Sequence, residues 1–195
     1  MSLREHVYSV LLVSSSEKMN ASLTSLLPDR IYYPLTVVSS VSEAQRKINE
    51  QSYDFVIVNA PLPDDFGRKF AIDVTTDNDA VTVLIVKNEL YDETYDKVAE
   101  YGVLTISKPT NAVMMKQTLD YMRATRERLY RMQKKTVSLE DKMTEIRLVN
   151  KAKWVLIENR GYSEEQAHKY IEKTAMDLGL TRREVAQTIL QFARS

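Results

Sequence analysis

The stretch DFVIVNAPLPDDFG, from Asp54 to Gly67, decides the fold. Four apolar residues lead into Asn59, and two prolines, an acidic pair and a glycine follow. A strand buried on both faces of a parallel α/β sheet has this pattern, and it delivers its last residue to the edge where such sheets bind ligands. An asparagine cannot act as a nucleophile. The stretch therefore predicts a prominent position that is occupied by an unreactive side chain.

Four further apolar runs repeat the strand pattern over the first 110 residues, and helical patterns separate them. The helical segments include 17–27, 42–51 and 90–101, and Ser40 with Glu43 makes a capping box for the second of these. This alternation predicts a flavodoxin-like, doubly wound sheet of five parallel strands. The expected strands are YSVLLV (8–13), LTVV (35–38), FVIV (55–58), VTVLIV (81–86) and VLTI (103–106).

The composition is that of a globular protein with one ordinary domain and one smaller one. The chain has 195 residues, of which 44% are hydrophobic and 28% are charged. No segment approaches the roughly 18 consecutive apolar residues that cross a bilayer, and the first apolar run fits a strand better than a secretory signal. The chain contains no cysteine, which excludes disulfides, a thiol nucleophile and cysteine-ligated zinc. We therefore expect a cytoplasmic protein without membrane contact.

The charge is unevenly placed along the chain, although the formal net charge is zero. Residues 1–112 hold 10 Lys and Arg against 16 Asp and Glu, residues 113–138 hold 7 against 2, and residues 139–195 hold 10 against 9. An acidic half followed by a basic helix indicates a regulatory module joined to a part that meets a polyanion. The alternative is that the basic residues form a solvated helix face.

A long helix is expected from residue 113 to about residue 159, because this part of the chain contains neither glycine nor proline. Its apolar residues recur mostly three and four positions apart, with Arg126 and Thr136 filling two places in the series. A stripe this narrow is typical of a coiled-coil seam. Met115 and Leu119 are expected to cover the sheet, and the alternative is that the rest of the helix packs back on the sheet as well. The residues expected to meet a partner helix in a homodimer are Met122, Leu129, Met132, Leu139, Met143 and Ile146.

Two shorter helices are predicted after the long one. Gly161 and Gly179 suit helix ends, and capping boxes that begin at Ser163 and Thr181 open the two following helices. The predicted organisation is a doubly wound domain at residues 1–112, a coiled-coil linker at residues 113–138 and a three-helix unit at residues 139–195.

The first 110 residues resemble a two-component receiver domain. VLLVSSSE stands where receivers carry ILIVDDE, FVIVNAPLPDDFG where they carry LVLLDIMMPGMDG, and TISKPT where they carry YLTKPF. Leu62, Pro63, Gly67, Lys108 and Pro109 match the family in register. The resemblance implies the receiver (CheY-like) fold and a cis peptide bond between Lys108 and Pro109.

The sequence departs from receivers at the residues that accept phosphate. Receivers place a phosphoryl group on an aspartate and hold Mg²⁺ with that aspartate and an acidic pair, because Mg²⁺ prefers anionic oxygen ligands. Serines here replace the acidic pair and Asn59 replaces the acceptor, so the resemblance implies a pseudo-receiver without metal or phosphate. Glu17, Asp64 or Asp65 could supply one stray acid, although acids so placed are also favoured at helix starts. The degenerate site comprises Ser14, Ser15, Asn59, Val86, Thr105 and Lys108. Of these six residues, only Lys108 is the residue that reactive receivers have at the same position.

Residues from about 140 to 195 resemble the ANTAR domain, an RNA-binding antitermination module found behind receivers. The matching residues are Ala152, Lys153, Leu156, Gly161, Ser163, Ala167, Met176, Val185 and Ala186. Trp154 stands at a position where the family has glycine, and Glu172 at a commonly basic one. Cations can grip phosphates and aromatic rings can stack on loop bases. The candidate RNA-binding residues are Lys151, Lys153, Trp154, Arg160, Lys169, Lys173, Arg182 and Arg183.

We therefore expect a dimeric transcription antiterminator that binds RNA hairpins in a nascent mRNA leader. Constitutive dimerisation, or an unidentified ligand or protein at the receiver face, would replace phosphorylation as the control. Two alternatives stay open: a DNA-binding regulator with a helix-turn-helix and a scaffold that binds protein through the pseudo-receiver face. An enzyme is not expected, because His6 and His168 fall in different predicted domains and no paired carboxylates or phosphate loop occur. No cofactor and no metal are expected.

Overall fold

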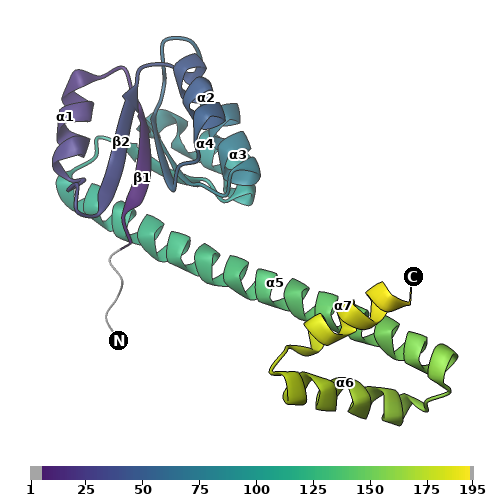
Figure 1. Ribbon diagram of the computed structural model, residues 1–195. Coiled ribbons are helices and arrows are strands. Elements are labelled where there is room, and N and C mark those ends of the chain that lie inside the picture. The colour runs from purple at the N-terminus through teal and green to yellow at the C-terminus, as the bar shows by residue number, and fades with distance from the viewer. Residues whose placement is uncertain (1–5, 194–195) are drawn as a thin grey trace. The chain divides into compact units, whose positions relative to one another are not determined.

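The computed structural model describes residues 6–193 of the chain (Figure 1). The chain divides into two compact units, one that ends at Tyr130 and one that begins at Arg131, and each is described by itself. The first unit therefore extends into the long helix, beyond the boundary at residue 112 that the sequence suggests. Over the described residues, no helix is both long enough and apolar enough to cross a membrane.

The first unit is the predicted flavodoxin-like fold, with five parallel strands in the order β2-β1-β3-β4-β5. All five residues of the central strand β3 are buried, which accounts for its continuously apolar sequence up to Asn59. The predicted strands are all present, although β2 begins at Tyr32 rather than at residue 35. The strands are β1 Tyr8–Val13, β2 Tyr32–Val38, β3 Phe55–Asn59, β4 Val81–Lys87 and β5 Leu104–Lys108.

Helices cover both faces of the sheet (Figure 1). One face packs against α2, α3 and α4 through a core that includes Ile48, Phe70 and Val98. The other face packs against α1 and the start of α5 through Leu23, Met115 and neighbouring residues. The helices are α1 Glu17–Ser25, α2 Val41–Glu50, α3 Arg68–Asp77, α4 Tyr91–Val98 and α5 Ala112–Arg160, with short 3₁₀ turns η1 Asn88–Leu90 and η2 Ala99–Tyr101 beside α4.

The capping box predicted at Ser40 is only half formed. The Ser40 hydroxyl accepts a hydrogen bond from the Glu43 N–H at 3.2 Å, as an N-cap should. The Glu43 carboxylate, however, accepts from the N–H and the hydroxyl of Ser39 instead of returning to Ser40. The prediction of the N-cap is confirmed, and the prediction of the reciprocal bond is wrong because Ser39 offers two donors one residue earlier.

The first turns of α5 belong to the core of the first unit. Met115 and Leu119 are each 3% exposed and cover the sheet, as expected. Met122 is also fully buried in this core, and Leu129 is half-buried against it. Met122 is therefore occupied within its own unit. This corrects the expectation that Met122 meets a partner helix, whereas the expectation for Leu129 stays a prediction; the exposed part of the stripe begins at Met132.

A buried ion pair anchors α5 to the sheet below β3. Arg126 is 8% exposed, and its Nε donates to Asp54 Oδ1 at 2.9 Å while its Nη1 donates to the Asp79 carbonyl at 2.7 Å. Tyr130 donates to the same Asp54 oxygen at 2.7 Å, and the Ser9 N–H donates to the other carboxylate oxygen at 2.9 Å. Arg126 is thus a buried anchor and not a member of a coiled-coil seam.

The second unit is built from the C-terminal part of α5, α6 Glu164–Leu178 and α7 Arg182–Phe192. Both predicted capping boxes are complete, at Ser163 with Gln166 and at Thr181 with Glu184. Gly161 and Gly179 adopt positive φ angles of 63° and 65° at the predicted helix ends. The apolar core of this unit comprises Ala152, Leu156, Ala167, Ile171, Ala175, Val185 and Ala186.

Candidate functional site

At the carboxyl edge of the sheet, where receivers accept phosphate, a hydrogen bond joins two neutral side chains. The Asn59 amide nitrogen donates to the Ser14 hydroxyl at 2.9 Å, and both side chains are buried. Lys108 donates to the Ala60 carbonyl at 2.5 Å, and burial together with the nearby Lys87 lowers the pKa of Lys108. The peptide bond between Lys108 and Pro109 is cis, as the resemblance implies. Three of the predicted residues therefore make hydrogen bonds at this edge, and none of them carries a carboxylate.

The remaining predicted residues of this edge carry no charge. Val86 is fully buried and Ser15 is exposed. The Thr105 hydroxyl and the Asn59 amide oxygen are buried, and among the described residues neither has a hydrogen-bond partner. Both groups are neutral, so the edge offers no anionic oxygen to a cation.

The acids that could rescue the site are engaged at the starts of helices. Asp64 accepts hydrogen bonds from the N–H groups of Ser42 and Val41, both at 2.9 Å, and these bonds lower the pKa of its carboxyl to about 2. Asp65 accepts from the Gly67 N–H at 2.6 Å, and Glu17 lies in the first turn of α1. Within residues 6–193, no cluster of three or more His, Asp or Glu side chains is placed to hold a metal ion.

The part of α5 that belongs to the second unit presents an exposed apolar stripe. Its members are more than half exposed: Met132 54%, Leu139 51%, Met143 54% and Ile146 58%. Their spacing of seven, four and three residues places them along one line of the helix. Four of the six predicted dimerisation residues therefore form one continuous exposed surface.

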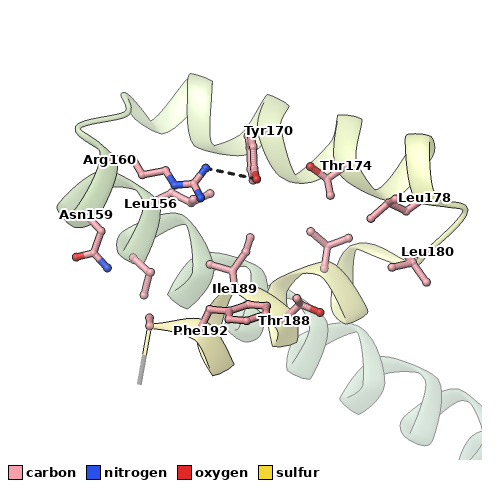
Figure 2. A pocket seen from close by; sticks show the side chains of 13 residues that line it. Leu156, Asn159, Arg160, Tyr170, Thr174, Leu178, Leu180, Thr188, Ile189 and Phe192 are labelled. Atoms are coloured by element: carbon pink, nitrogen blue, oxygen red, sulfur yellow. Dashed lines mark hydrogen bonds between the residues drawn. The ribbon is translucent and has the colours of Figure 1, made fainter. Parts of the chain in front are cut away.

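A groove of about 430 Å³ opens between α5, α6 and α7 (Figure 2). Its apolar wall includes Leu178 and Phe192, which are 64% and 78% exposed. At one end the Arg160 guanidinium lies 5.4 Å from the centre of the Tyr170 ring and donates to the Tyr170 hydroxyl at 3.5 Å, the contact drawn dashed in Figure 2. The Asn159 amide lies at the same end. The groove thus combines aromatic rings, a cation and an amide.

The predicted RNA-binding residues do not form one cluster. Ion pairs engage three of them: Lys153 with Glu164 at 3.1 Å, Lys169 with Glu165 at 2.7 Å, and Arg182 with Glu145 at 3.1 Å. Arg160 lines the groove, and Arg183 lines a shallow hollow together with Lys134 and Lys142. Lys151, Lys173 and Trp154 are exposed at other places on the unit.

Sequence reasoning missed Asn159 and Phe192 in the groove and the lysines beside Arg183. Phe192 follows Val185 by seven residues and Ile189 by three, so it continues one apolar face of α7, and this spacing was a usable signal. The lysines give no such signal. They lie in α5, and only the tertiary packing of α7 brings Arg183 to them.

Comparison with solved structures identifies the fold of the first unit. The signal receiver domain of an HD domain-containing protein from Pseudomonas fluorescens Pf-5 is 20% identical, with a TM-score of 0.57 over 69% of this chain and 96% of its own. The chemotaxis response regulator CheY4 of Vibrio cholerae is 19% identical, with a TM-score of 0.52 over 60% of this chain and 98% of its own. An adenylate cyclase from Rhodopirellula baltica is 16% identical, with a TM-score of 0.59 over 68% of this chain and 98% of its own. The first unit therefore has the receiver fold.

Residues 138–190 match the ANTAR domain family, and these residues lie within the second unit. A comparison with curated protein sequences finds no match. The chain therefore has a receiver fold followed by a segment that matches the ANTAR domain family.

Proposed function

We propose that this chain is a dimeric RNA-binding regulator that prevents transcription termination. The observation that carries the proposal is the match of residues 138–190 to the ANTAR domain, which falls within one compact three-helix unit. ANTAR domains recognise paired hairpins, so hairpins in a nascent mRNA leader are the expected ligands. A dimer supplies two modules for two hairpins.

The groove of Figure 2 supports a contact with an unpaired loop base. Single-stranded RNA bases stack on aromatic rings or guanidinium planes and use amides to read their edges. Phe192 offers an exposed ring, and Asn159 with Arg160 offers polar groups at one end of the groove. We place a loop base against the apolar wall and the following phosphate beside Arg160.

Replacing Arg160 with alanine is expected to weaken hairpin binding about tenfold. The change removes both the positive charge and the planar guanidinium group that lies over the Tyr170 ring. Fluorescence anisotropy with a labelled hairpin at fixed salt measures the effect. Lys69→Ala is the matched control, since it removes one positive charge from an exposed residue of α3 in the first unit, outside every candidate RNA contact. Equal losses in the two variants would contradict a role for the groove.

The nature of the nucleic acid is tested with hairpin RNA and duplex DNA of matched length and charge. Tight binding to the hairpin and weak, sequence-independent binding to the duplex supports the proposal, and the reverse result supports a DNA-binding regulator. Read-through of a terminator that follows the hairpin then tests antitermination in a transcription reaction with purified polymerase. A protein that retains a protein partner but binds neither nucleic acid supports a scaffold.

The receiver fold is proposed to work without phosphorylation. An acyl phosphate needs a carboxylate acceptor, and Asn59 instead donates its amide N–H to Ser14. The capture of Mg²⁺ needs anionic oxygens, and the nearby carboxylates of Asp64 and Asp65 already accept backbone N–H groups. Constitutive pairing of the chains, or an unidentified protein or ligand at this face, takes the place of the phosphate signal.

Incubation with acetyl phosphate and Mg²⁺ is expected to leave both the mass and the oligomeric state of the protein unchanged. Intact-mass spectrometry and light scattering at low protein concentration provide the two measurements. A receiver domain with an intact aspartate, treated in parallel, controls for an active phosphodonor. A phosphoryl adduct on this chain, or a monomer that dimerises only with the donor, would contradict the proposal.

A further inference from the structure

Trp154 points away from the core of the second unit. Its neighbours two positions away on each side, Ala152 and Leu156, are 0% and 3% exposed, whereas Trp154 is 64% exposed. Two residues correspond to a rotation of roughly 200° around an α-helix, so the indole leaves α5 on the side opposite the core. An indole exposed to this degree has a large apolar surface with no cover from its own chain.

The exposed stripe of α5 continues to this residue. After Met143 and Ile146, steps of four residues lead to Asn150 and then to Trp154, and Asn150 is exposed as well. Asn150 lies seven residues after Met143, so the two occupy equivalent positions of the heptad. One face of the helix therefore carries Met132, Leu139, Met143, Ile146, Asn150 and Trp154.

We infer that the pairing surface of α5 extends past Ile146 through Asn150 and Trp154, and that its occupant is a second copy of this chain. The inference rests on the proposed dimer and deepens it. It removes Trp154 from the residues that contact RNA and gives this residue, which stands where ANTAR domains have glycine, a role in assembly.

The polar residue in the stripe favours a helix of the same sequence as the occupant. A single asparagine at such a heptad position pairs with its counterpart and fixes a parallel, in-register, two-stranded arrangement. Charges do not decide the register, because Lys135 of one copy would face Glu140 of the other, whereas Lys142 would face Arg147. Asn150 is therefore the residue that sets the register of the two paired helices.

The surroundings of Trp154 also argue against RNA as the occupant. A hollow of about 300 Å³ beside the indole is lined by Asn150, Lys153, Ile157 and Glu164. The cation in this hollow is Lys153, whose side chain is only 15% exposed and forms an ion pair with Glu164 at 3.1 Å, so it is not free to bind a phosphate. The next basic residue on the face of the helix that carries Trp154 is Arg147, which lies seven residues earlier. An apolar ring of the second copy suits this hollow better than a phosphate does.

Disulfide trapping tests the inference, since the chain has no cysteine of its own. The full-length variants Leu139→Cys and Asn150→Cys are both expected to form covalent dimers on mild oxidation, because facing seam positions lie within reach of a disulfide. Lys151→Cys, an exposed neighbour turned out of the stripe, is expected to stay monomeric on a denaturing gel. Cross-linking of Leu139→Cys without Asn150→Cys would overturn the inference and leave the dimer standing. Failure of both would overturn the proposed dimer itself.

Fluorescence provides a second readout, since Trp154 is the chain's only tryptophan. Its emission is expected to shift to shorter wavelength as protein concentration rises, and to stay at longer wavelength in a variant with both Leu139 and Ile146 replaced by serine. Addition of hairpin RNA to this variant is expected to leave the emission unchanged. Quenching by RNA there would return Trp154 to the RNA interface and refute the inference.

Discussion

Replacing Arg126 with alanine is expected to lower the free energy of unfolding of the first unit by about 3–5 kcal/mol, because it leaves the Asp54 carboxylate buried and short of its cation. The two side chains are 10% and 12% exposed, so water cannot readily take the place of the lost partner. Arg128→Ala is the matched control: this arginine lies two residues further along α5, is exposed, and should change stability by less than about 0.5 kcal/mol.

Hydrogen exchange of the β3 amides measures this loss within the first unit, where a whole-chain melting curve would mix two units. Burial raises the pKa of Asp54, but hydrogen bonds from Tyr130, Ser9 and Arg126 outweigh it, and the net pKa is lowered. The stabilisation is therefore present above the carboxyl's ordinary pKa and is lost as the pH falls through the lowered value. The difference in the free energy of unfolding between the Arg126→Ala variant and the native chain should therefore become smaller over that acidic range. Equal exchange in the Arg126 and Arg128 variants at neutral pH would refute the anchor.

Replacing Leu139 and Ile146 together with serine is expected to give a monomer and to lower affinity for an RNA with two hairpins by about 100-fold. The substitutions remove two apolar members of the exposed stripe, which are 51% and 58% exposed, and add no charge that could alter RNA binding. Affinity for a single hairpin should stay unchanged, because one module binds one hairpin. Light scattering and anisotropy with one-hairpin and two-hairpin RNAs make the comparison.

Val137→Ser is the control for this experiment. Val137 is 58% exposed on the same helix, but it lies off the line of Met132, Leu139 and Met143. This variant should remain a dimer with full affinity for the two-hairpin RNA. A Leu139 and Ile146 double variant that stays dimeric would place the pairing surface elsewhere, and one that loses single-hairpin binding would indicate damage to the module itself.

The sequence predicted the sheet well because parallel strands buried on both faces must be continuously apolar, and a short run such as FVIV before Asn59 fits few other elements. The helix end at Gly161 and the reciprocal cap at Ser163 could also be predicted, since their bonds are local, whereas the reciprocal bond at Ser40 failed because Ser39 competes for Glu43. The extent of the first unit could not be predicted from the sequence. Asp54 and Arg126 are 72 residues apart, and nothing local indicates that they meet.

The same limit applies to the candidate sites. The placement of Ser14 and Asn59 at one edge could be predicted, because each occupies a position fixed by its own strand end. The stripe of α5 could be predicted as a periodicity, but its start could not. Met122 fits the heptad and yet is buried in the sheet core, because the helix faces the sheet there. The groove residues Asn159 and Phe192 lie on two helices that only packing brings together.

The neutral bond between Asn59 and Ser14 bears on how such a regulator responds in a cell. Phosphorylation normally controls regulators that have a receiver domain, so the fraction of active chains then depends on the phosphate signal. On the function proposed above, a chain that has no phosphate acceptor at this edge and pairs through its own exposed helix would obey mass action instead. Its activity would then follow the rate at which it is made and destroyed, and the expression level would be the signal.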